Sequence, residues 1–277
     1  MVITDNAQRY SISALCEILG VARATYYRKR DQIKADPKSD PLENEVITEY
    51  HKSHGIYGAR RIKRALNRRG IVISRRKIGH IMKKNQLVSA YTKKKYKKPK
   101  EVLRNSQDPN ILNRCFNGYA PHSHIASDLT YVKIAGKWNY ICLLIDLANR
   151  EIAGHAAGSH KDAQLVKSSF ATLDFPLTDI DVFHSDRGSE FDNQEIDAIL
   201  DVFDIKRSLS RKGNPYDNAV VEATNKALKT EFIYRTSFVD LADLRQQLNS
   251  YVSWYNNERL HSTLGYLTPV EYKKKNL

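Results

Sequence analysis

Residues 124–158, HIASDLTYVKIAGKWNYICLLIDLANREIAGHAAG, decide the fold class. The stretch divides into three segments rich in β-branched, aromatic and aliphatic residues, at 124–134, 137–147 and 150–158. Short turns at Ala135-Gly136 and Asn149-Arg150 separate these segments. The residue types of the three segments and the short turns between them predict three consecutive strands.

The chain after these strands alternates between helical and strand patterns. We expect helices near 161–173, 193–203, 216–233 and 239–257, and strands at 179–186 and 205–210. Three strands in a row followed by alternating helices and strands are typical of a mixed α/β sheet. The sequence therefore predicts an α/β domain over residues 121–277.

The charge of the chain is concentrated in its first part. Residues 1–120 hold 27 Lys and Arg against 10 Asp and Glu, a net charge of +17, whereas residues 121–277 hold 18 against 21, a net charge of −3. A net charge of +17 over 120 residues predicts a polyanionic partner, and double-stranded DNA is the partner that fits it best. A membrane surface fits less well, because the basic helices carry Gly, Asn and Arg where a lipid-inserting face needs bulky apolar groups.

Cysteine usage and apolar patterning exclude several classes of protein. Cys16, Cys115 and Cys142 have no C-x-x-C spacing and lie near no pair of histidines, which argues against a disulfide framework and a zinc site. The N-terminus does not resemble a signal peptide, and the longest apolar stretch, around 141–145, is too short to span a bilayer. We expect a cytoplasmic, nucleoid-associated protein with no membrane partner.

Residues 1–32 predict a first DNA-binding unit. The segment SALCEILGVARATYYRK (13–29) shows a helix, a tight Gly20-Val21 turn and a second helix, which fits a helix-turn-helix or any short helical hairpin. We expect Leu15, Ile18 and Leu19 on one face, with Arg23 and Arg28 outside as candidate DNA contacts.

Residues 41–88 predict a second DNA-binding unit of three helical segments. Gly55 and Gly70 suit helix C-termini, and Ser74 suits an N-cap. Apolar residues at helical spacing form an inward stripe: Ile62, Ala65, Leu66, Ile78, Ile81 and Met82. The basic residues left outside predict phosphate contacts: Arg60, Arg61, Arg64, Arg75, Arg76 and Lys77.

Residues 89–120 predict a basic linker. Its segment YTKKKYKKPK (91–100) holds six lysines and two tyrosines. We expect Lys93, Lys94 and Lys95 to follow a DNA backbone, and a solubilising linker is the alternative interpretation.

Three carboxylates predict the catalytic centre. Asp128 lies within the first expected strand, Asp186 ends the fourth, and Glu222 lies in the following helix. If the first and fourth strands are neighbours, these groups form an oxygen-only cage suited to two Mg²⁺ or Mn²⁺ ions. Asp146, which also ends a strand, and Glu231 are rival candidates.

A second chemistry would use the same stretch differently. His184 and Arg187 form H-x-x-R, as in tyrosine recombinases. That class would place the motif on a helix, whereas Ile180, Val182 and Phe183 alternate as in a strand. We therefore assign the catalytic role to Asp186 and expect Arg187 to contact DNA, while the role of His184 stays open.

The carboxylate spacing resembles the acidic triad of DDE transposases and retroviral integrases. Asp186 follows Asp128 after 57 residues, Glu222 follows after 35 more, and Lys229 lies seven beyond. HSDRGSEF (184–191), GNPYDNAVVEATNKALKTE (213–231) and WYNNERLHSTLGYLTP (254–269) look like the catalytic reading frame of the insertion-sequence-three family. The resemblance covers roughly residues 42–273.

The resemblance implies an RNase H-like five-stranded mixed sheet with flanking helices, in which the first strand lies beside the fourth. It also implies metal-dependent 3′-end cleavage and strand transfer of an insertion sequence, whose terminal repeats and target are DNA. Lys229, and less strongly Lys226, would hold a phosphate. Synapsis implies at least a homodimer, and the family implies an upstream-frame product fused by frameshifting as a further partner.

Two other functions remain open at this point. A DNA-binding regulator would share the basic N-terminal part but would not need all three carboxylates. A nuclease for single strands or RNA·DNA hybrids would not need two DNA-reading units. The C-terminal segment NERLHSTLGYLTPVEY (257–272) fits equally well a partner or DNA contact and a packed lid.

Overall fold

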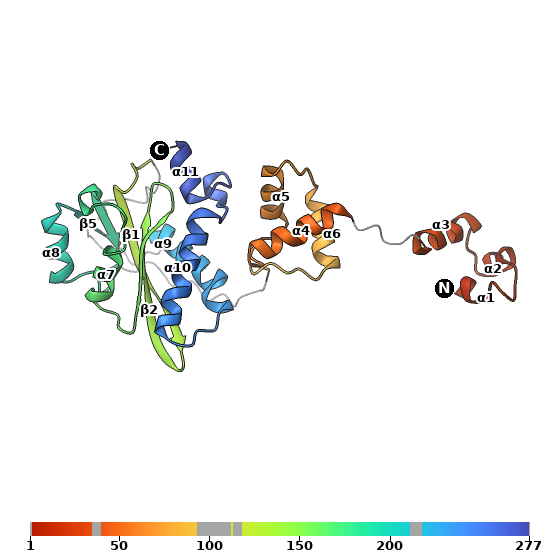
Figure 1. The fold of residues 1–277 in the computed structure, drawn as a ribbon, viewed down its shortest axis with the longest axis horizontal. Helices are drawn as coiled ribbons and strands as arrows, with labels where there is room; N and C mark the ends of the chain where they lie inside the picture. The colour runs from red at the N-terminus through yellow and green to blue at the C-terminus, as the bar shows by residue number, and fades with distance from the viewer. Residues whose placement is uncertain (1, 35–39, 93–111, 113–117, 211–217, 277) are drawn as a thin grey trace. The chain divides into compact units, whose positions relative to one another are not determined.

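The computed structural model describes residues 2–34, 40–92, 112, 118–210 and 218–276 (Figure 1). Two compact units result, Met1–Thr48 and Glu49–Leu277. The expected boundaries at 32, 41–88 and 121 stay predictions, because the division into units lies inside a helix, at Thr48. Lys93, Lys94 and Lys95 lie outside the described residues.

The first unit contains the expected helix-turn-helix. Helices α2 (Ile12–Ile18) and α3 (Arg23–Lys34) follow a short α1 (Val2–Asn6) that the sequence pattern did not predict. Ser11 caps α2 by accepting a hydrogen bond from the Ala14 amide at 3.2 Å, and Gly20 takes the left-handed conformation (φ +63°) that the turn requires.

The expected inward face of α2 is wrong in part. Cys16 is the buried residue, at 2% exposure, whereas Ile18 is 79% and Leu19 46% exposed. The reason is helical geometry, since successive residues are rotated by about 100°, which puts Ile18 on the side opposite Cys16.

The next helices are α4 (Pro41–Lys52), α5 (Ala59–Arg68) and α6 (Arg75–Lys84). The six residues of the predicted inward stripe are all buried. Ser74 caps α6 through the Lys77 amide at 3.1 Å, and Gly70 follows α5 with φ +79°, so both predicted helix ends are confirmed.

A five-stranded mixed sheet forms the second part of the larger unit, as the sequence predicts. Its strands are β1 (His124–Ile134), β2 (Lys137–Asp146), β3 (Ile152–Gly158), β4 (Val182–Ser185) and β5 (Lys206–Leu209). Their order is β3-β2-β1-β4-β5. β1, β2 and β3 pair antiparallel, whereas β4 pairs parallel to both β1 and β5.

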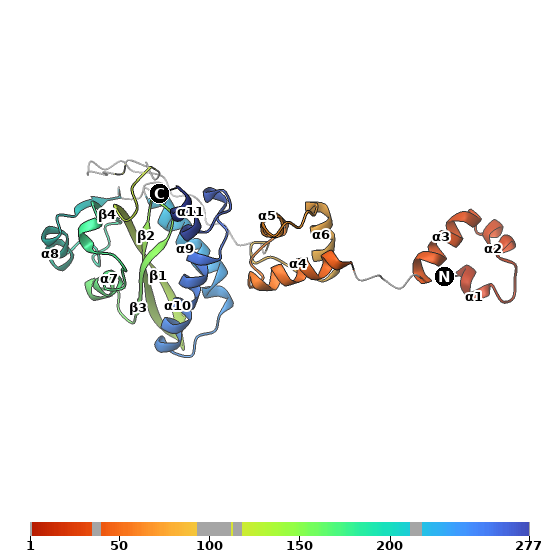
Figure 2. The same cartoon turned by 45° about the horizontal axis from the view of Figure 1, so that its top comes forward.

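Helices cover both faces of this sheet (Figures 1 and 2). α7 (Ala163–Phe170) and α8 (Gln194–Val202) lie on one face, and α9 (Ala219–Glu231) and α10 (Leu241–Asn257) on the other. α11 (Pro269–Asn276) packs against α10. The core under α7 and α8 includes Ile125, Leu144, Val166, Phe183 and Ile196. An apolar layer thus covers one side of the central strands β1 and β4.

Candidate active site

Asp128 and Asp186 meet because β1 and β4 are parallel neighbours. Their register pairs Ala126 with His184, and Asp128 and Asp186 each lie two residues further along. Residues two apart on a strand face the same side of the sheet, so the two carboxylates emerge at the same level. Ligands of open α/β sheets bind at such carboxyl ends of strands.

Asp128 is held by two donors. The Asn225 side-chain amide donates to Oδ2 at 2.9 Å, and the Leu129 amide donates to Oδ1 at 2.8 Å. Burial and the nearby Asp186 and Glu222 raise the pKa of Asp128 to about 6, despite these two hydrogen bonds. Burial is the largest cause of this shift, and the negative charges of Asp186 and Glu222 add to it.

Asp186 lies directly after β4 and is anchored by the loop that follows. Its Oδ1 accepts a hydrogen bond from the Gly188 amide at 2.9 Å. The loop then folds back, since the Phe191 and Asp192 amides both donate to the Gly188 carbonyl at 2.9 Å. This loop therefore fixes one oxygen of Asp186 and turns residues 188–191 back toward the sheet.

Glu222 lies in the first turn of α9, which packs against β1. Glu222 is largely exposed to solvent, but part of it is covered by the protein, and this partial burial raises the pKa of its carboxyl group. Asn225, one turn later on the same helix, contacts Asp128, so α9 presents Glu222 toward the same region.

The donor set fits hard divalent ions, because it consists of carboxylate oxygens alone. Among the residues that the structure describes, no three His, Cys, Asp or Glu side chains lie close enough together to hold one ion. The parallel register of β1 and β4, together with the hydrogen bond from Asn225 of α9 to Asp128, is the observation that supports a shared site.

The two rival carboxylates have structural roles instead. Asp146 is fully buried and accepts hydrogen bonds from the His122 and Ala148 amides at 2.9 and 2.8 Å, which closes the turn after β2. Glu231 is buried, and it pairs with Arg259 through two contacts of 2.7 Å. Burial alone would raise the pKa of Glu231, but Arg259 holds it below its usual value.

His184 lies on strand β4, as the sequence predicts for this stretch, and not on a helix. It is fully buried in β4, and its Nδ1 lies 2.9 Å from the Ser208 hydroxyl of β5. This position ties two neighbouring strands together. It does not present the imidazole to a phosphate at the surface.

Sequence reasoning missed one ion pair beside these carboxylates. Lys161, just before α7, places its Nζ 3.0 Å from Oε1 of Glu190, which lies in the loop after Asp186. Glu190 is buried, at 2% exposure. No spacing rule links two residues so far apart in the chain, so only the folded structure reveals the pair.

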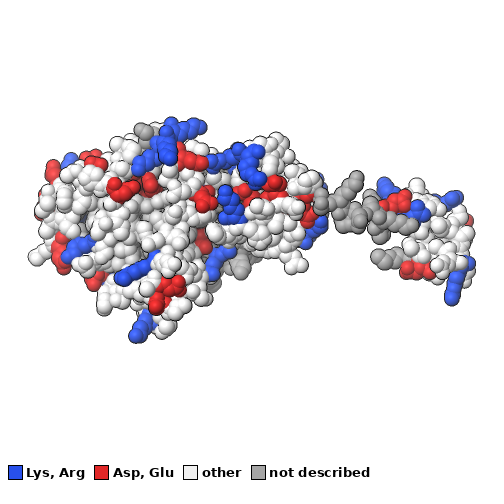
Figure 3. Space-filling view, viewed as in Figure 1, with Lys and Arg blue, Asp and Glu red and all other residues white. Residues whose placement is uncertain are grey.

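The predicted DNA contacts lie in several places. Arg23, Arg28, Arg60, Arg64, Arg75, Arg76, Lys77 and Lys226 are exposed, and Arg187 is half-buried. Lys229 is also half-buried, with its Nζ 4.7 Å from the centre of the Tyr131 ring. On the face drawn in Figure 3, Lys and Arg are interspersed with Asp and Glu, so no single positive field covers this face.

Arg61 differs from its neighbours in the predicted basic stripe. Its guanidinium lies over the rings of Tyr57 and Tyr91, at 5.6 and 5.5 Å, and 3.9 Å from Glu231. The structure therefore gives Arg61 an internal position, which the helical pattern alone did not separate from that of Arg60 or Arg64.

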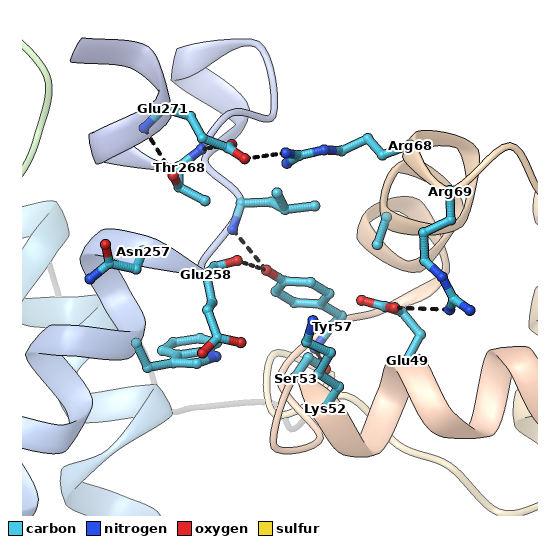
Figure 4. Close-up of a pocket in the computed structure, with 13 residues that line it drawn as sticks. Glu49, Lys52, Ser53, Tyr57, Arg68, Arg69, Asn257, Glu258, Thr268 and Glu271 are labelled. Atoms are coloured by element: carbon cyan, nitrogen blue, oxygen red, sulfur yellow. Dashed lines mark hydrogen bonds and ion pairs between the residues drawn. The ribbon is translucent and has the colours of Figure 1, made fainter. Parts of the chain in front are cut away.

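The C-terminal segment packs as a lid against the helical region before the sheet (Figure 4). The Tyr57 hydroxyl donates to the Glu258 carbonyl at 3.2 Å and accepts from the Leu260 amide at 2.7 Å. Arg68 pairs with Glu271. His261 is buried, and burial together with the nearby Arg259 lowers its pKa to about 2. Of the two interpretations of this segment, the contacts support the packed lid.

Family models match the chain in three stretches. A model described as an HTH-like domain matches residues 38–95, and two models described as integrase core domains match residues 118–215 and 203–269. No helix of the described residues combines the length and apolar character needed to cross a membrane.

Curated relatives align over nearly the whole chain. The transposase for insertion sequence element IS904 of Lactococcus lactis is 30% identical over 87% of this chain and 98% of its own length. The putative transposase InsK for insertion sequence element IS150 of Escherichia coli is 28% identical over 99% of this chain and 97% of its own.

Solved structures of retroviral integrases also resemble the chain. The HTLV-2 integrase catalytic core domain in complex with magnesium is 18% identical to this chain, with a TM-score of 0.44. The match covers 56% of this chain and 99% of the HTLV-2 chain. A simian T-cell lymphotropic virus intasome in complex with a PP2A regulatory subunit shares 16% identity over 76% of this chain and 70% of that chain, with a TM-score of 0.47.

Proposed function

The chain belongs to the insertion-sequence-three family of transposases, in the retroviral-integrase superfamily, and we propose that it cleaves the 3′ ends of an insertion sequence and transfers them to target DNA. The observation that carries this proposal is the matched position of Asp128 and Asp186 on two parallel strands, beside a helix that carries Glu222.

In this mechanism the three carboxylates would hold two Mg²⁺ or Mn²⁺ ions. Bound at such a site, a pair of ions lowers the pKa of an attacking water or 3′-OH and stabilises the leaving oxygen. Asp128 and Asp186 would contribute ligands from the sheet side, and Glu222 would contribute a ligand from α9. No covalent bond between protein and DNA is required.

Other residues orient these ligands. Asn225 donates to one oxygen of Asp128 and the Leu129 amide to the other, which fixes the plane of the carboxylate. The Gly188 amide holds one oxygen of Asp186. Ligands that are held before metal and DNA arrive reduce the reorganisation needed in the reaction.

The basic residues supply the DNA contacts of the proposal. Lys226 and Lys229 follow Glu222 on α9, and Arg187 directly follows Asp186; these three residues hold the phosphates of the element end. The exposed arginines and lysine of α5 and α6, with Arg23 and Arg28 in the first unit, bind the terminal repeats. Lys93, Lys94 and Lys95 stay predictions for the linker, and Arg61 is the weakest member of the set because of its internal position.

Two ends must be joined in one complex, so the proposal includes a homodimer or higher oligomer on DNA. The frameshifted fusion with an upstream-frame product stays a prediction.

Strand cleavage and joining on labelled DNA with the element's own ends tests the proposal. The native protein and Glu222→Gln are compared with Mg²⁺ and with EDTA. We expect 3′-end cleavage and joined products only for the native protein with Mg²⁺, while both proteins bind the DNA equally. Asp197→Asn, an exposed aspartate that pairs with Arg207, is the matched control and should keep activity.

Tight DNA binding with no chemistry in either protein would contradict the proposal for the chain alone. Adding an upstream-frame product would then distinguish a regulator from a catalytic subunit that requires that partner.

A further inference from the structure

The ion pair of Lys161 and Glu190 lies at the edge of the proposed catalytic centre. The Lys161 ammonium is within electrostatic range of Asp186 and Asp128 as well as bonded to Glu190. Burial alone would lower the pKa of Lys161, but these three carboxylates hold it above its usual value. A fixed positive charge thus lies beside the cluster of acidic ligands.

The two partners differ sharply in exposure. The side chain of Lys161 is 49% exposed, whereas that of Glu190 is 2% exposed. One end of the pair is therefore anchored in the protein, and the other reaches solvent where a DNA strand would approach.

Glu190 is costly to keep as a buried carboxylate. Its Oε1 contacts Lys161, but its Oε2 is buried with no hydrogen-bond partner among the described residues. A buried acceptor left unsatisfied destabilises a protein by about 1–3 kcal/mol, and more when it is charged. Stability alone does not explain a glutamate here.

Gly188 makes room for this carboxylate. A Cβ at position 188 would lie 2.5 Å from Cδ and Oε1 of Glu190. The carboxylate of Glu190 therefore packs directly on the loop whose Gly188 amide anchors Asp186. The loop holds an acidic ligand and the anchor of a lysine within the same short turn.

We propose that Lys161 contacts a DNA phosphate at the catalytic centre, and that Glu190 is a positioning residue that holds the Lys161 ammonium for this contact. The inference rests on the proposed function. A free lysine side chain loses rotamer freedom when it binds a phosphate, and the contact with Glu190 removes part of that loss beforehand.

The test uses the full-length protein with Mg²⁺ and labelled element ends. Duplexes carry a single neutral methylphosphonate in place of each phosphate near the cleavage position, one position per substrate. Single-turnover cleavage and joining rates are compared for the native protein, Lys161→Gln, Lys161→Arg, Glu190→Gln and Gly188→Ala. Lys167→Gln is the control, because Lys167 pairs with Glu195 on an exposed surface.

Lys161→Gln should slow the reaction by about 10- to 100-fold, the range for a lost hydrogen bond to a charged group. At one phosphate, the methylphosphonate should slow the native protein by a similar factor and leave Lys161→Gln unaffected. Lys161→Arg should recover part of the rate. Glu190→Gln should cause a smaller loss that vanishes when Lys161→Gln is already present. Gly188→Ala also disturbs the loop that anchors Asp186, so its loss should persist in part in the Lys161→Gln background.

The inference is overturned if Lys161→Gln cleaves and joins DNA as fast as the native protein does. It is also overturned if the native protein and Lys161→Gln are slowed equally by every methylphosphonate. A merely structural role of Glu190 would lower thermal stability without changing the methylphosphonate profile, and that result also overturns it. If the native protein shows no metal-dependent cleavage at all, the proposed function itself fails; an active native protein with an unaffected Lys161→Gln rejects this inference alone.

Discussion

The protonation of Asp128 depends on the other charged groups of the site. Asp128 is a carboxylate on a central strand, placed near two further carboxylates, and its pKa is raised to about 6 by burial and by Asp186 and Glu222. A folded-state pKa above the unfolded value means that the folded protein binds an extra proton between the two values. Without metal, this single residue therefore opposes folding as the pH rises.

Asp128→Asn should become more stable relative to the native protein as the pH rises from about 4 to about 7. The pKa of Asp128 is about 6 in the folded protein, against an ordinary value of 3.8. The contribution of Asp128 to stability is therefore fully present below pH 3.8 and is lost as the pH rises through about 6. Denaturant unfolding without metal at several pH values measures the difference. In an Asp186→Asn background, which removes a like charge, the effect should shrink; an unchanged effect would show that Asp186 does not act on Asp128.

Glycine substitutions test the packing between elements. A Cβ on Gly154 of β3 would lie 2.6 Å from the Ser169 carbonyl oxygen of α7, whereas one on Gly79 of α6 would meet nothing within 4 Å. The same change therefore has opposite consequences at the two positions.

Gly154→Ala should destabilise the protein by about 1–3 kcal/mol through overpacking, and Gly79→Ala should stabilise it by about 0.5–1 kcal/mol through helix propensity. Denaturant unfolding of the two variants provides the measurement. A Gly154→Ala protein as stable as the native one would mean that α7 moves away from β3 at little cost.

Glu231 and Arg259 join elements that lie apart in the chain. Glu231 is the last residue of α9, and Arg259 follows α10. Tyr251 also donates to Glu231, at 3.1 Å, and Tyr91, near the start of the predicted linker, contributes a further hydrogen bond. The pair thus links the sheet domain to the first residues of the predicted linker.

Glu231→Gln should lower the free energy of unfolding by about 3–5 kcal/mol, because it leaves the Arg259 charge buried without its partner. Glu195→Gln, which breaks the exposed pair with Lys167, should cost no more than about 1 kcal/mol. Urea unfolding compares the two. Equal, small losses would indicate that water reaches Arg259 in the folded protein.

At the scale of the whole molecule, charge divides the chain. The first 120 residues carry a net charge of +17 and the remainder −3, so DNA affinity should come mainly from the first part. Within that part the structure separates Arg61, which lies over two tyrosine rings, from the exposed Arg76.

Arg76→Gln should reduce the slope of log affinity against log salt by about 0.9, the effect of one lost phosphate contact. Arg61→Gln should leave the slope nearly unchanged and lower stability instead. Arg207→Gln, in the sheet domain, serves as the control since Arg207 pairs with Asp192 and Asp197. Fluorescence anisotropy with duplex DNA over a range of salt measures all three. An equal loss of slope for Arg61→Gln and Arg76→Gln would place both side chains on DNA.

The sequence by itself determined the helices and strands of the sheet domain, whereas the position of the first strand beside the fourth was implied only by the family resemblance. β-Branched, aromatic and aliphatic residues specify β1 and β2 locally, together with the Ala135-Gly136 turn, whose φ values are +45° and +82°. A two-residue turn with positive φ joins antiparallel strands. Helix ends at Gly70 and Ser74 are equally local. The carboxylates Asp128, Asp186 and Glu222 were named from their spacing and resemblance, and their catalytic roles stay a proposal.

Tertiary structure alone decided which charged groups meet. Glu231 and Glu222 share one helix, yet only Glu231 lies against Arg259, and Lys161 finds Glu190 across the fold. The internal position of Arg61 is a result of the same kind. The physical reason is that backbone conformation and apolar periodicity are set by near neighbours in the chain. Burial and ion pairing depend instead on which distant segments pack together.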